Sequence, residues 1–249
     1  MHIACWNGDA ESTATIILAH EHNEPLDEIV FVEPMFDANT SAIPDAHVDF
    51  IKNIGTPVFR SWNYVVTLLR AERTFLDCFF KICSRGENKG KYRGFLHPKY
   101  CRLNREVKFP TIKAYAKTKD SNAVLYLGIT TEDTSRARII DKQNYDSLLI
   151  KYGITTIAAE RICAEHDLLS PQYRITKEPF CLFCPRARKK DMRNLRDKHP
   201  DLFEKLCNLE TEENVVTNVW DPARNRSLLK IRDEFFADDS ILFSNLVGD

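Results

Sequence analysis

The sequence Cys181-Leu-Phe-Cys184-Pro places two thiols at a spacing suited to one metal ion. Cysteines three positions apart in a tight turn can direct both thiolates at the same ion, and thiolates favour zinc or an iron–sulfur cluster. Such a pair supplies half of a four-ligand site, and Cys101 and Cys163 are the candidates for the other half. A redox dithiol is the weaker interpretation, because it is expected at a helix start after a strand, whereas this pair follows a proline-marked loop.

A second stretch that could do chemistry is CWNGDAESTATIILAH, residues 5–20. It has the layout of a nucleotide-phosphate loop, in which an apolar strand meets a polar, glycine-bearing turn and then a hydroxyl-rich helix start. The stretch lacks the lysine or second glycine that such a loop is expected to carry. It is therefore either a modified working site or the remains of one. The loop residues are Asn7, Gly8, Asp9, Ala10, Glu11 and Ser12.

A third candidate is LGITTEDTSR, residues 127–136, which follows an apolar run. Gly128 at the end of this run would let a ligand approach the backbone, and Glu132, Asp133 and Arg136 could hold a ribose, a magnesium ion or a phosphate. The alternative is a polar turn with a purely structural role.

These candidates fall at the ends of predicted strands. Apolar runs predict strands at HIACW, DEIVFVEP, YVVTLL and AVLYLGI, and helices are predicted after Asp9, in HVDFIKNI and at Thr111–Lys117. This alternation predicts an α/β fold with a doubly wound parallel sheet. Ligands of such sheets bind beyond the carboxyl ends of the strands, so the loops after Trp6, Val32 and Ile129 should converge there.

The C-terminal third is predicted to be helical and to carry the CxxC pair. A helix is expected at Thr155–Leu168, then an irregular stretch SPQYRITKEPFCLFCP, then one or two amphipathic helices broken at Pro200. Residues after Glu212 are weakly patterned, apart from the apolar segment SILFSNLV. We therefore expect a nucleotide-binding α/β domain at residues 1–165 and a small C-terminal helical, cysteine-bearing appendage at residues 166–249.

The formal net charge of −1 conceals segregated charges. Residues 81–117 hold eleven Lys and Arg against two Glu, residues 186–198 hold seven against two Asp, and residues 201–249 hold eleven acids against five bases. The basic segment 81–117 is either a solvated surface or a site for phosphate, sulfate or a nucleic-acid backbone.

Composition argues against a membrane protein. The chain of 249 residues is 43% hydrophobic and 29% charged, and no apolar run reaches the roughly 18 residues that a membrane span needs. The N-terminus lacks the pattern of a secretory signal. We expect a cytoplasmic protein with no membrane partner, whose eight cysteines are reduced or bind metal. Nothing in the sequence specifies an oligomeric state.

The order of these pieces over roughly residues 1–212 resembles the phosphoadenosine-phosphosulfate (PAPS) reductase-like family of adenine-nucleotide alpha hydrolases. The family's phosphate loop, SGGKDS, is matched in position by NGDAES, and the acidic end of its next strand is matched by Glu33. Its basic segment, with a cysteine, an arginine and then a lysine before a proline, is matched by Cys101, Arg102 and Lys108.

Two further parts of the family pattern follow in order. A strand that ends in GI, with an acidic pair and then an arginine, is matched by Gly128, Glu132, Asp133 and Arg136. The family then has a helix with a cysteine, an SPLY-like stretch, a C-x-x-C-P motif and an HPELW sequence. Their counterparts here, in the same order, are Cys163, SPQY, CLFCP and HPDLF.

The resemblance implies binding of an adenine nucleotide at the loop, Glu33, Arg102, Lys108 and the segment 128–136, with magnesium accompanying ATP. Family members either split ATP to AMP and pyrophosphate during sulfur transfer, or reduce a sulfonucleotide with a cysteine in the C-terminal tail. No cysteine follows Cys207, which disfavours reduction. The set Cys101, Cys163, Cys181 and Cys184 is similar to a cluster-holding set and implies a [4Fe–4S] cluster, with zinc as the alternative.

The departure from the family pattern lies in the loop itself. Ala10 stands where the family has lysine, and Asp9 stands at its second glycine. Loss of a charged hydrogen bond costs about 1.5–3 kcal/mol, and an added carboxylate repels phosphate. We therefore expect an adenine-nucleotide-binding protein with weakened ATP-pyrophosphatase or sulfurtransferase chemistry. The alternative is a non-catalytic module that binds nucleic acid or protein through the basic segment and the cysteine site.

Overall fold

The computed structural model describes residues 1–95, 101–140, 144–175, 181–221 and 223–247. Its chain divides into two compact units. The sheet unit comprises Met1–Met35, Ile43–Glu72 and Val107–Pro179, and the cysteine unit comprises Phe36–Ala42, Arg73–Glu106 and Phe180–Asp249. The sequence predicts one boundary after residue 165, whereas these units alternate along the chain. Residues 96–100 of the basic segment and residues 176–180 ahead of the CxxC pair lie outside the described residues.

The sheet unit is an α/β fold around a parallel sheet, as the sequence predicts. Five strands are hydrogen-bonded in the order β3-β2-β1-β4-β5, and every pairing is parallel. All six residues of β2 are buried, which explains its unbroken apolar run. The fifth strand is not predicted, because two residues are too short to show a period. The strands are β1 (His2–Trp6), β2 (Glu28–Glu33), β3 (Val65–Arg70), β4 (Val124–Tyr126) and β5 (Tyr145–Asp146).

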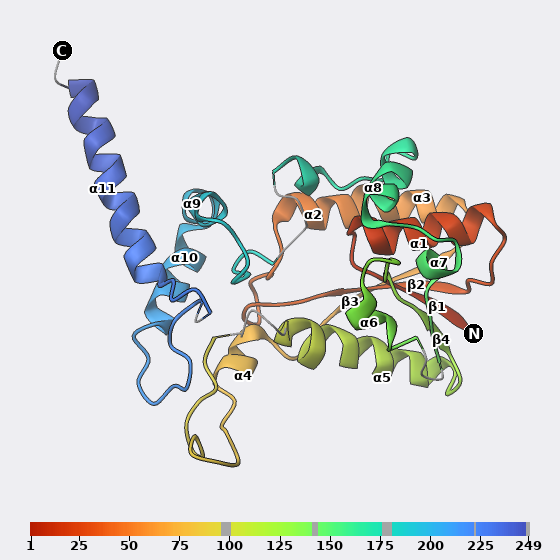
Figure 1. Ribbon diagram of the computed structural model, residues 1–249, viewed down its shortest axis with the longest axis horizontal. Coiled ribbons are helices and arrows are strands. Elements are labelled where there is room, and N and C mark those ends of the chain that lie inside the picture. The colour runs from red at the N-terminus through yellow and green to blue at the C-terminus, as the bar shows by residue number, and fades with distance from the viewer. Residues whose placement is uncertain (96–100, 141–143, 176–180, 222, 248–249) are drawn as a thin grey trace. The chain divides into compact units, whose positions relative to one another are not determined.

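Helices cover both faces of this sheet, with α1, α3 and α8 on one face and α5 on the other (Figure 1). The predicted helices are confirmed, although the last ends at Glu165. Three helices of this unit begin at a capping residue, since Asp9, Ser147 and Thr155 each accept a backbone N–H with a side-chain oxygen. The helical segments are α1 (Ala10–Glu21), α2 (Asp45–Asp49), π-helical η1 (Phe50–Gly55), α3 (Thr56–Ser61), π-helical η2 (Leu103–Lys108), α5 (Phe109–Lys119), α6 (Thr134–Ala137), α7 (Leu148–Lys151), α8 (Thr156–Glu165) and 3₁₀-helical η3 (Pro171–Arg174). Of these, η2 crosses the boundary between the units, because its residues up to Glu106 belong to the cysteine unit.

The core of the sheet unit is built around Trp6, the last residue of β1. Its buried ring makes an edge contact with Phe59, with ring centroids 5.0 Å apart, and its indole N–H donates to the Thr13 hydroxyl at 3.0 Å. A Cβ at Gly55 would lie 2.6 Å from the Trp6 ring, so a side chain at that position would displace it. These contacts fix the end of β1, from which the candidate phosphate loop departs.

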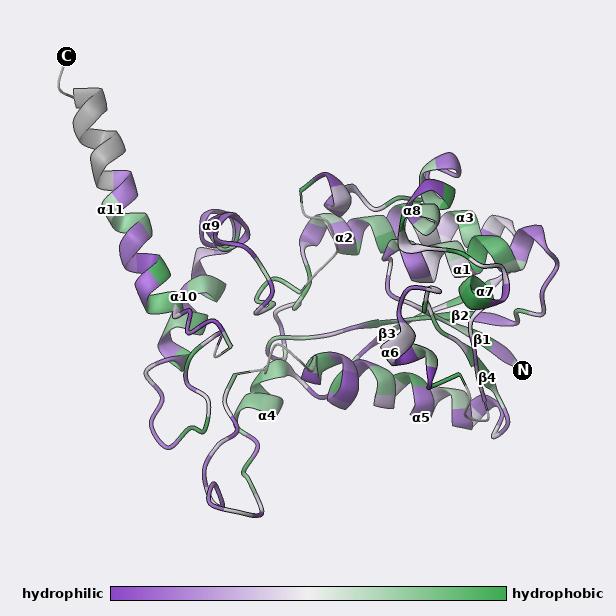
Figure 2. Cartoon of the chain, viewed as in Figure 1, coloured by the Kyte–Doolittle hydropathy of each residue, from purple (hydrophilic) through white to green (hydrophobic). Residues whose placement is uncertain are grey.

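The cysteine unit is mainly helical and has an aromatic core. Phe75 lies at its centre, 4.5 Å from Phe183 and 5.5 Å from Phe36 between ring centroids. The break at Pro200 is confirmed, and α9 is strongly hydrophilic whereas α4 is apolar (Figure 2). The helix α11 is longer than any predicted from the sequence. The helices are α4 (Phe75–Phe79), α9 (Lys189–Lys198), α10 (Pro200–Leu209) and α11 (Leu228–Val247). Within the described part of the chain, no helix combines the length and apolar character needed to cross a bilayer.

Candidate functional site

The strand order places the candidate nucleotide loops next to one another. Strands β2 and β3 lie on one side of β1, and β4 and β5 lie on the other, so the order reverses between β1 and β4. Open parallel sheets bind ligands at such a reversal, outside the carboxyl ends of the strands. The loops that follow β1 and β4 carry two of the sequence-predicted groups, residues 7–12 and residues 128–136.

The two loops approach so closely that only glycine fits between them. A Cβ built at Gly128 would lie 2.7 Å from the Ser12 amide nitrogen and 2.9 Å from the Glu11 carbonyl carbon. At Gly8, where φ is +75°, a Cβ would lie 2.5 Å from the Ile51 side chain and 2.7 Å from the His47 ring. Both glycines are therefore required by close packing, and the predicted proximity is confirmed for the segments after β1 and β4. The convergence of the loop after Val32 with them stays a prediction.

Three amide groups of the loop after β1, those of Asn7, Ala10 and Ser12, already donate to protein oxygens. The Asn7 N–H donates to the Ser12 hydroxyl at 2.9 Å, and the Ser12 N–H donates to the Asp9 carboxylate at 2.8 Å. The Ala10 N–H donates to the Tyr173 hydroxyl at 2.8 Å. In a phosphate loop such amides face the ligand. Here they stabilise the loop itself.

His47 fixes this loop from the opposite side. It is 2% exposed, and its Nε2 lies 2.9 Å from the Asn7 carbonyl oxygen while Nδ1 lies 2.9 Å from the Ser170 hydroxyl. A carbonyl only accepts, so Nε2 donates, and the neutral ring leaves Nδ1 to accept from Ser170. Burial lowers the pKa of His47, which favours this neutral form. No local sequence signal marks His47, because its role depends on contacts distant in the chain.

Lys108, at the end of η2, acts on groups beside the loop. Burial raises the pKa of Cys5, near the end of β1, and the charge of Lys108 opposes this shift. Burial lowers the pKa of His47, and the charge of Lys108 lowers it further. Because the loop has Ala10 where lysine is expected, Lys108 is a basic side chain that can supply positive charge to this end of the sheet.

The acidic residues after β4 serve as helix caps. The Glu132 carboxylate accepts from the Thr156 N–H at the start of α8 at 2.9 Å. The Asp133 carboxylate caps α6 by accepting from the Arg136 N–H at 3.0 Å, and it also pairs with the Arg136 side chain. Glu33 ends β2 and is 8% exposed. Magnesium at Glu132 or Asp133 would compete with these caps.

A cavity of about 590 Å³ lies beside this region, in the wall formed by α8 and η3. Its lining includes Ser170 and Tyr173, whose hydroxyls contact His47 and the loop, together with Glu160, Asp167 and Arg174. Burial raises the pKa of Tyr173, so its hydroxyl remains protonated at neutral pH. The sequence marks this wall only through the SPQY stretch.

The CxxC pair lies in the cysteine unit and forms a tight turn. The Cys184 N–H donates to the Cys181 carbonyl at 3.1 Å, and the thiols of the pair are hydrogen-bonded to each other. The pKa of Cys181 is raised by that bond, by burial and then by the charges of Cys184 and Cys101. Phe183 anchors the turn, because its carbonyl accepts from the Trp220 indole at 2.9 Å. Cys101 thus belongs to the surroundings of the pair.

The fourth predicted ligand is placed differently. Cys163 lies in the sheet unit, fully buried in α8, and its thiol donates to the Ala10 carbonyl at 3.2 Å. Burial raises the pKa of this thiol. Among the residues that the structure describes, no group of three or more His, Cys, Asp or Glu is arranged to hold a metal ion. The structure brings two of the four predicted ligands, Cys181 and Cys184, into contact.

Arg102 belongs to the cysteine unit, whereas the loop residues and Lys108 belong to the sheet unit. Burial lowers the pKa of Arg102, the charge of Arg93 lowers it further, and Glu106 opposes this shift.

Comparison with known proteins adds no assignment: no protein-family model, curated protein or solved structure matches the chain.

Proposed function

We propose that the sheet unit binds an adenine nucleotide outside the carboxyl ends of β1 and β4, in the manner of PAPS reductase-like proteins, and hydrolyses it weakly or not at all. The observation that carries this proposal is the packing of Gly128 against the loop at Ser12, at the point where the strand order reverses. Parallel sheets bind nucleotides at this location. Lys108 supports the proposal, because its positive charge acts on Cys5 and His47, two residues beside the loop.

Weak hydrolysis follows from the state of the loop. The Ser12 and Ala10 amides already donate to Asp9 and Tyr173, so a terminal phosphate would have to replace two existing hydrogen bonds. The Asp9 carboxylate also repels the phosphate. The nucleotide's base and ribose should therefore contribute more of the affinity than its terminal phosphates.

The test is a calorimetric titration with ATP, with and without magnesium. The titration compares the original chain with three variants: the double substitution Asp9→Gly/Ala10→Lys, Lys108→Ala and Lys117→Ala. Lys117 is an exposed lysine of α5 and serves as the control. We expect weak binding by the original chain and tighter binding by the double variant. Lys108→Ala should weaken binding about tenfold, the effect of one charged contact, and Lys117→Ala should not.

A non-catalytic role is the second candidate, favoured by the Asn7, Ala10 and Ser12 amides, which already donate to protein oxygens. Failure of both the original chain and the double variant to bind ATP would contradict the nucleotide proposal and support this one. Any nucleic-acid contact would then involve the basic segment 81–117 rather than α9, because Lys189, Arg193 and Arg196 of α9 already pair with acids of α11.

We also propose that Cys181 and Cys184, with Cys101, hold a [4Fe–4S] cluster, with zinc as the alternative. The two thiols in contact fit two ligand positions of either group. Because the pKa of Cys181 is raised, metal binding must displace its proton and should weaken as pH falls. Cys163 is the remaining cysteine of the set that the resemblance implies.

Metal content decides between these options. Anaerobically purified protein should contain iron and sulfide, Cys181→Ser should lose them, and the control Cys83→Ser should keep them. Colourless protein with one zinc per chain would replace the cluster by zinc. Absence of both metals from the original chain would contradict a metal site.

A further inference from the structure

The cysteine unit contains a buried cationic nitrogen with no hydrogen-bond partner. Among the described residues, Nη1 of Arg102 is shielded from solvent and contacts no acceptor. A buried donor left unpaired costs about 1–3 kcal/mol, and more when it is charged. Unpaired buried groups are rare in folded proteins, and an unseen ion or water is one of the ordinary reasons for them.

Neighbouring charges make the site more positive. Arg93 Nη1 donates to both carboxylate oxygens of Glu106, at 2.7 and 3.0 Å, and Lys81 Nζ lies 3.6 Å from the same carboxylate. The Arg93 N–H also donates to the Lys81 carbonyl at 3.0 Å, which holds these two residues side by side. Arg93 and Glu106 are both close enough to Arg102 to act on its charge.

Glu106 therefore cannot balance the cluster. It carries one negative charge, and both of its oxygens already accept from Arg93, while Lys81 lies 3.6 Å from the same carboxylate and Arg102 stands four residues before it in the chain. The side chains of Lys81 and Arg93 remain 41% and 29% exposed, so the cluster is open to solutes. A surplus of two positive charges beside a buried guanidinium N–H matches a small doubly charged anion.

We propose that Lys81, Arg93 and Arg102 bind a tetrahedral oxyanion, phosphate or sulfate, with one of its oxygens accepting from Nη1 of Arg102. These three residues belong to the cysteine unit, whereas the loop after β1 belongs to the sheet unit. A single buried donor suits one anionic group. A nucleic-acid backbone, in contrast, would require a row of exposed cations and a steep dependence on salt.

The experiment measures thermal unfolding and calorimetric binding with inorganic sulfate and phosphate, in a chloride buffer at constant ionic strength. The original chain should be stabilised by either oxyanion. Arg102→Gln should bind it at least about tenfold more weakly, and Lys81→Gln should also bind it more weakly. Arg105→Gln, which alters an exposed arginine of the same segment, should bind as the original chain does.

A second readout separates a binding role from a structural one. Without oxyanion, Arg102→Gln should unfold at the same or a higher temperature than the original chain, because it removes an unpaired buried charge. Unfolding at a clearly lower temperature would mean that Arg102 supports the fold, and would overturn the proposal. No response of the original chain to either oxyanion, or an equal response of Arg102→Gln, would also overturn it.

The source of the oxyanion is distinguished by comparing phosphate, AMP and adenosine. If AMP binds more tightly than phosphate, and this binding is lost in Arg102→Gln, the bound oxyanion is the phosphate of a nucleotide. Equal binding of AMP and phosphate would mean that the site takes a free anion.

The Asp9→Gly/Ala10→Lys variant should leave phosphate binding by this cluster unchanged, so this test and the ATP test can fail independently. An oligonucleotide that binds through Lys81 when sulfate does not would overturn the proposal in favour of nucleic acid.

Discussion

At the scale of single residues, His47 connects the candidate loop to the wall of the neighbouring cavity. Its two nitrogens contact the Asn7 carbonyl and the Ser170 hydroxyl, and Ser170 lines the cavity. The neutral ring satisfies both contacts, with Nε2 as donor and Nδ1 as acceptor, and burial favours this form by lowering the pKa of His47. The stability of the folded loop therefore depends on the protonation state of one buried histidine.

This dependence predicts a loss of stability in mild acid. The pKa of His47 is lowered in the folded protein, so the unfolded chain binds the proton first. The stabilisation is complete above the unfolded pKa of about 6.5 and declines as pH falls from there toward the folded pKa, with a slope of at most about 1.4 kcal/mol per pH unit. Denaturant unfolding between pH 7.5 and 5 should show a shallower decline for His47→Gln than for the original chain. The exposed His22→Gln should keep the original slope, and an unchanged slope in His47→Gln would contradict the prediction.

At the scale of elements, α11 shows how one helix is attached by buried and exposed contacts. The Glu210 carboxylate, 8% exposed, accepts from the Leu228 N–H at 2.9 Å and from the Leu229 N–H at 3.1 Å. A carboxylate at a helix N-terminus satisfies free amides and interacts favourably with the helix dipole. Leu228, Ile231 and Phe235 are buried below it.

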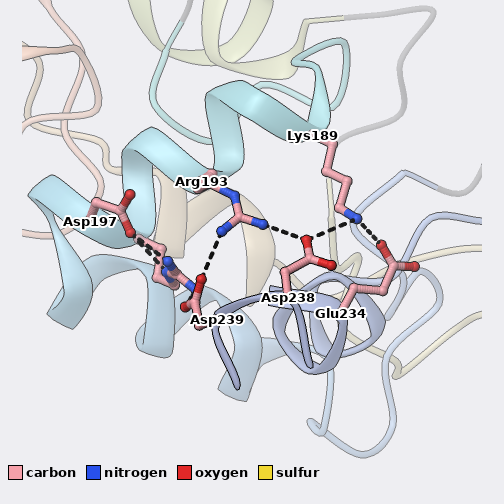
Figure 3. Close-up of polar contacts among 7 residues, drawn as sticks. Lys189, Arg193, Asp197, Glu234, Asp238 and Asp239 are labelled. Carbon is pink, nitrogen blue, oxygen red and sulfur yellow. Dashed lines mark hydrogen bonds and ion pairs between the residues drawn. The ribbon is translucent and has the colours of Figure 1, made fainter. Parts of the chain in front are cut away.

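Farther along, α11 is joined to α9 by a row of ion pairs (Figure 3). Arg193 donates to Asp238 at 2.6 Å and to Asp239 at 2.9 Å, and Arg196 donates to Asp239 at 2.8 Å. The guanidinium groups of Arg193 and Arg196 also lie over the buried ring of Phe235, with distances of 4.4 and 5.0 Å to its centroid. The second basic block of the sequence is thus partly neutralised by the acidic tail.

The two kinds of contact should differ in size and in their response to salt. Asp239→Asn should lower the free energy of unfolding by about 0.5–1 kcal/mol at low salt and by less at 1 M salt, because exposed pairs are screened. Glu210→Gln should cost about 1–3 kcal/mol at either salt concentration, because it weakens buried hydrogen bonds. Denaturant unfolding at both salt concentrations measures this. Asp233→Asn, a highly exposed control on α11, should have little effect. A salt-independent loss in Asp239→Asn would contradict the prediction.

The sequence was sufficient to predict elements whose signal is local. Continuous apolar runs predicted β1 to β4, and Pro200 predicted the break between α9 and α10. The helix α11 had local signals that were overlooked, namely Ser227 as a cap and apolar residues at 228, 231 and 235. The position of the candidate loop was predictable for the same reason. Its contacts with Tyr173 and His47 were not, because they join residues 163 and 40 positions apart.

At the scale of the whole molecule, the two units share the chain in alternating segments. Phe36 and Phe75 reach the core of the cysteine unit from segments that lie between parts of the sheet unit. Both pack on Phe183, which belongs to the C-terminal segment. The boundary after residue 165 predicted from composition and motifs therefore separates residues that pack together, since pattern alone cannot show which distant segments share a core.

This arrangement predicts that residues 166–249 do not fold as an independent domain. The fragment lacks Phe36 and Phe75, so Phe183 would lose its aromatic partners, and removal of a buried aromatic side chain typically costs 3–5 kcal/mol. Circular dichroism should show no cooperative thermal transition for the fragment alone, whereas co-expression with residues 1–165 should restore one. A cooperative transition in the isolated fragment would contradict the prediction.

The N-terminal fragment of residues 1–165 is also incomplete, because it lacks Ser170 and Tyr173, the partners of His47 and Ala10. Residues 1–179 retain both, so their sheet unit should resist proteolysis in the loop after β1 longer than that of residues 1–165.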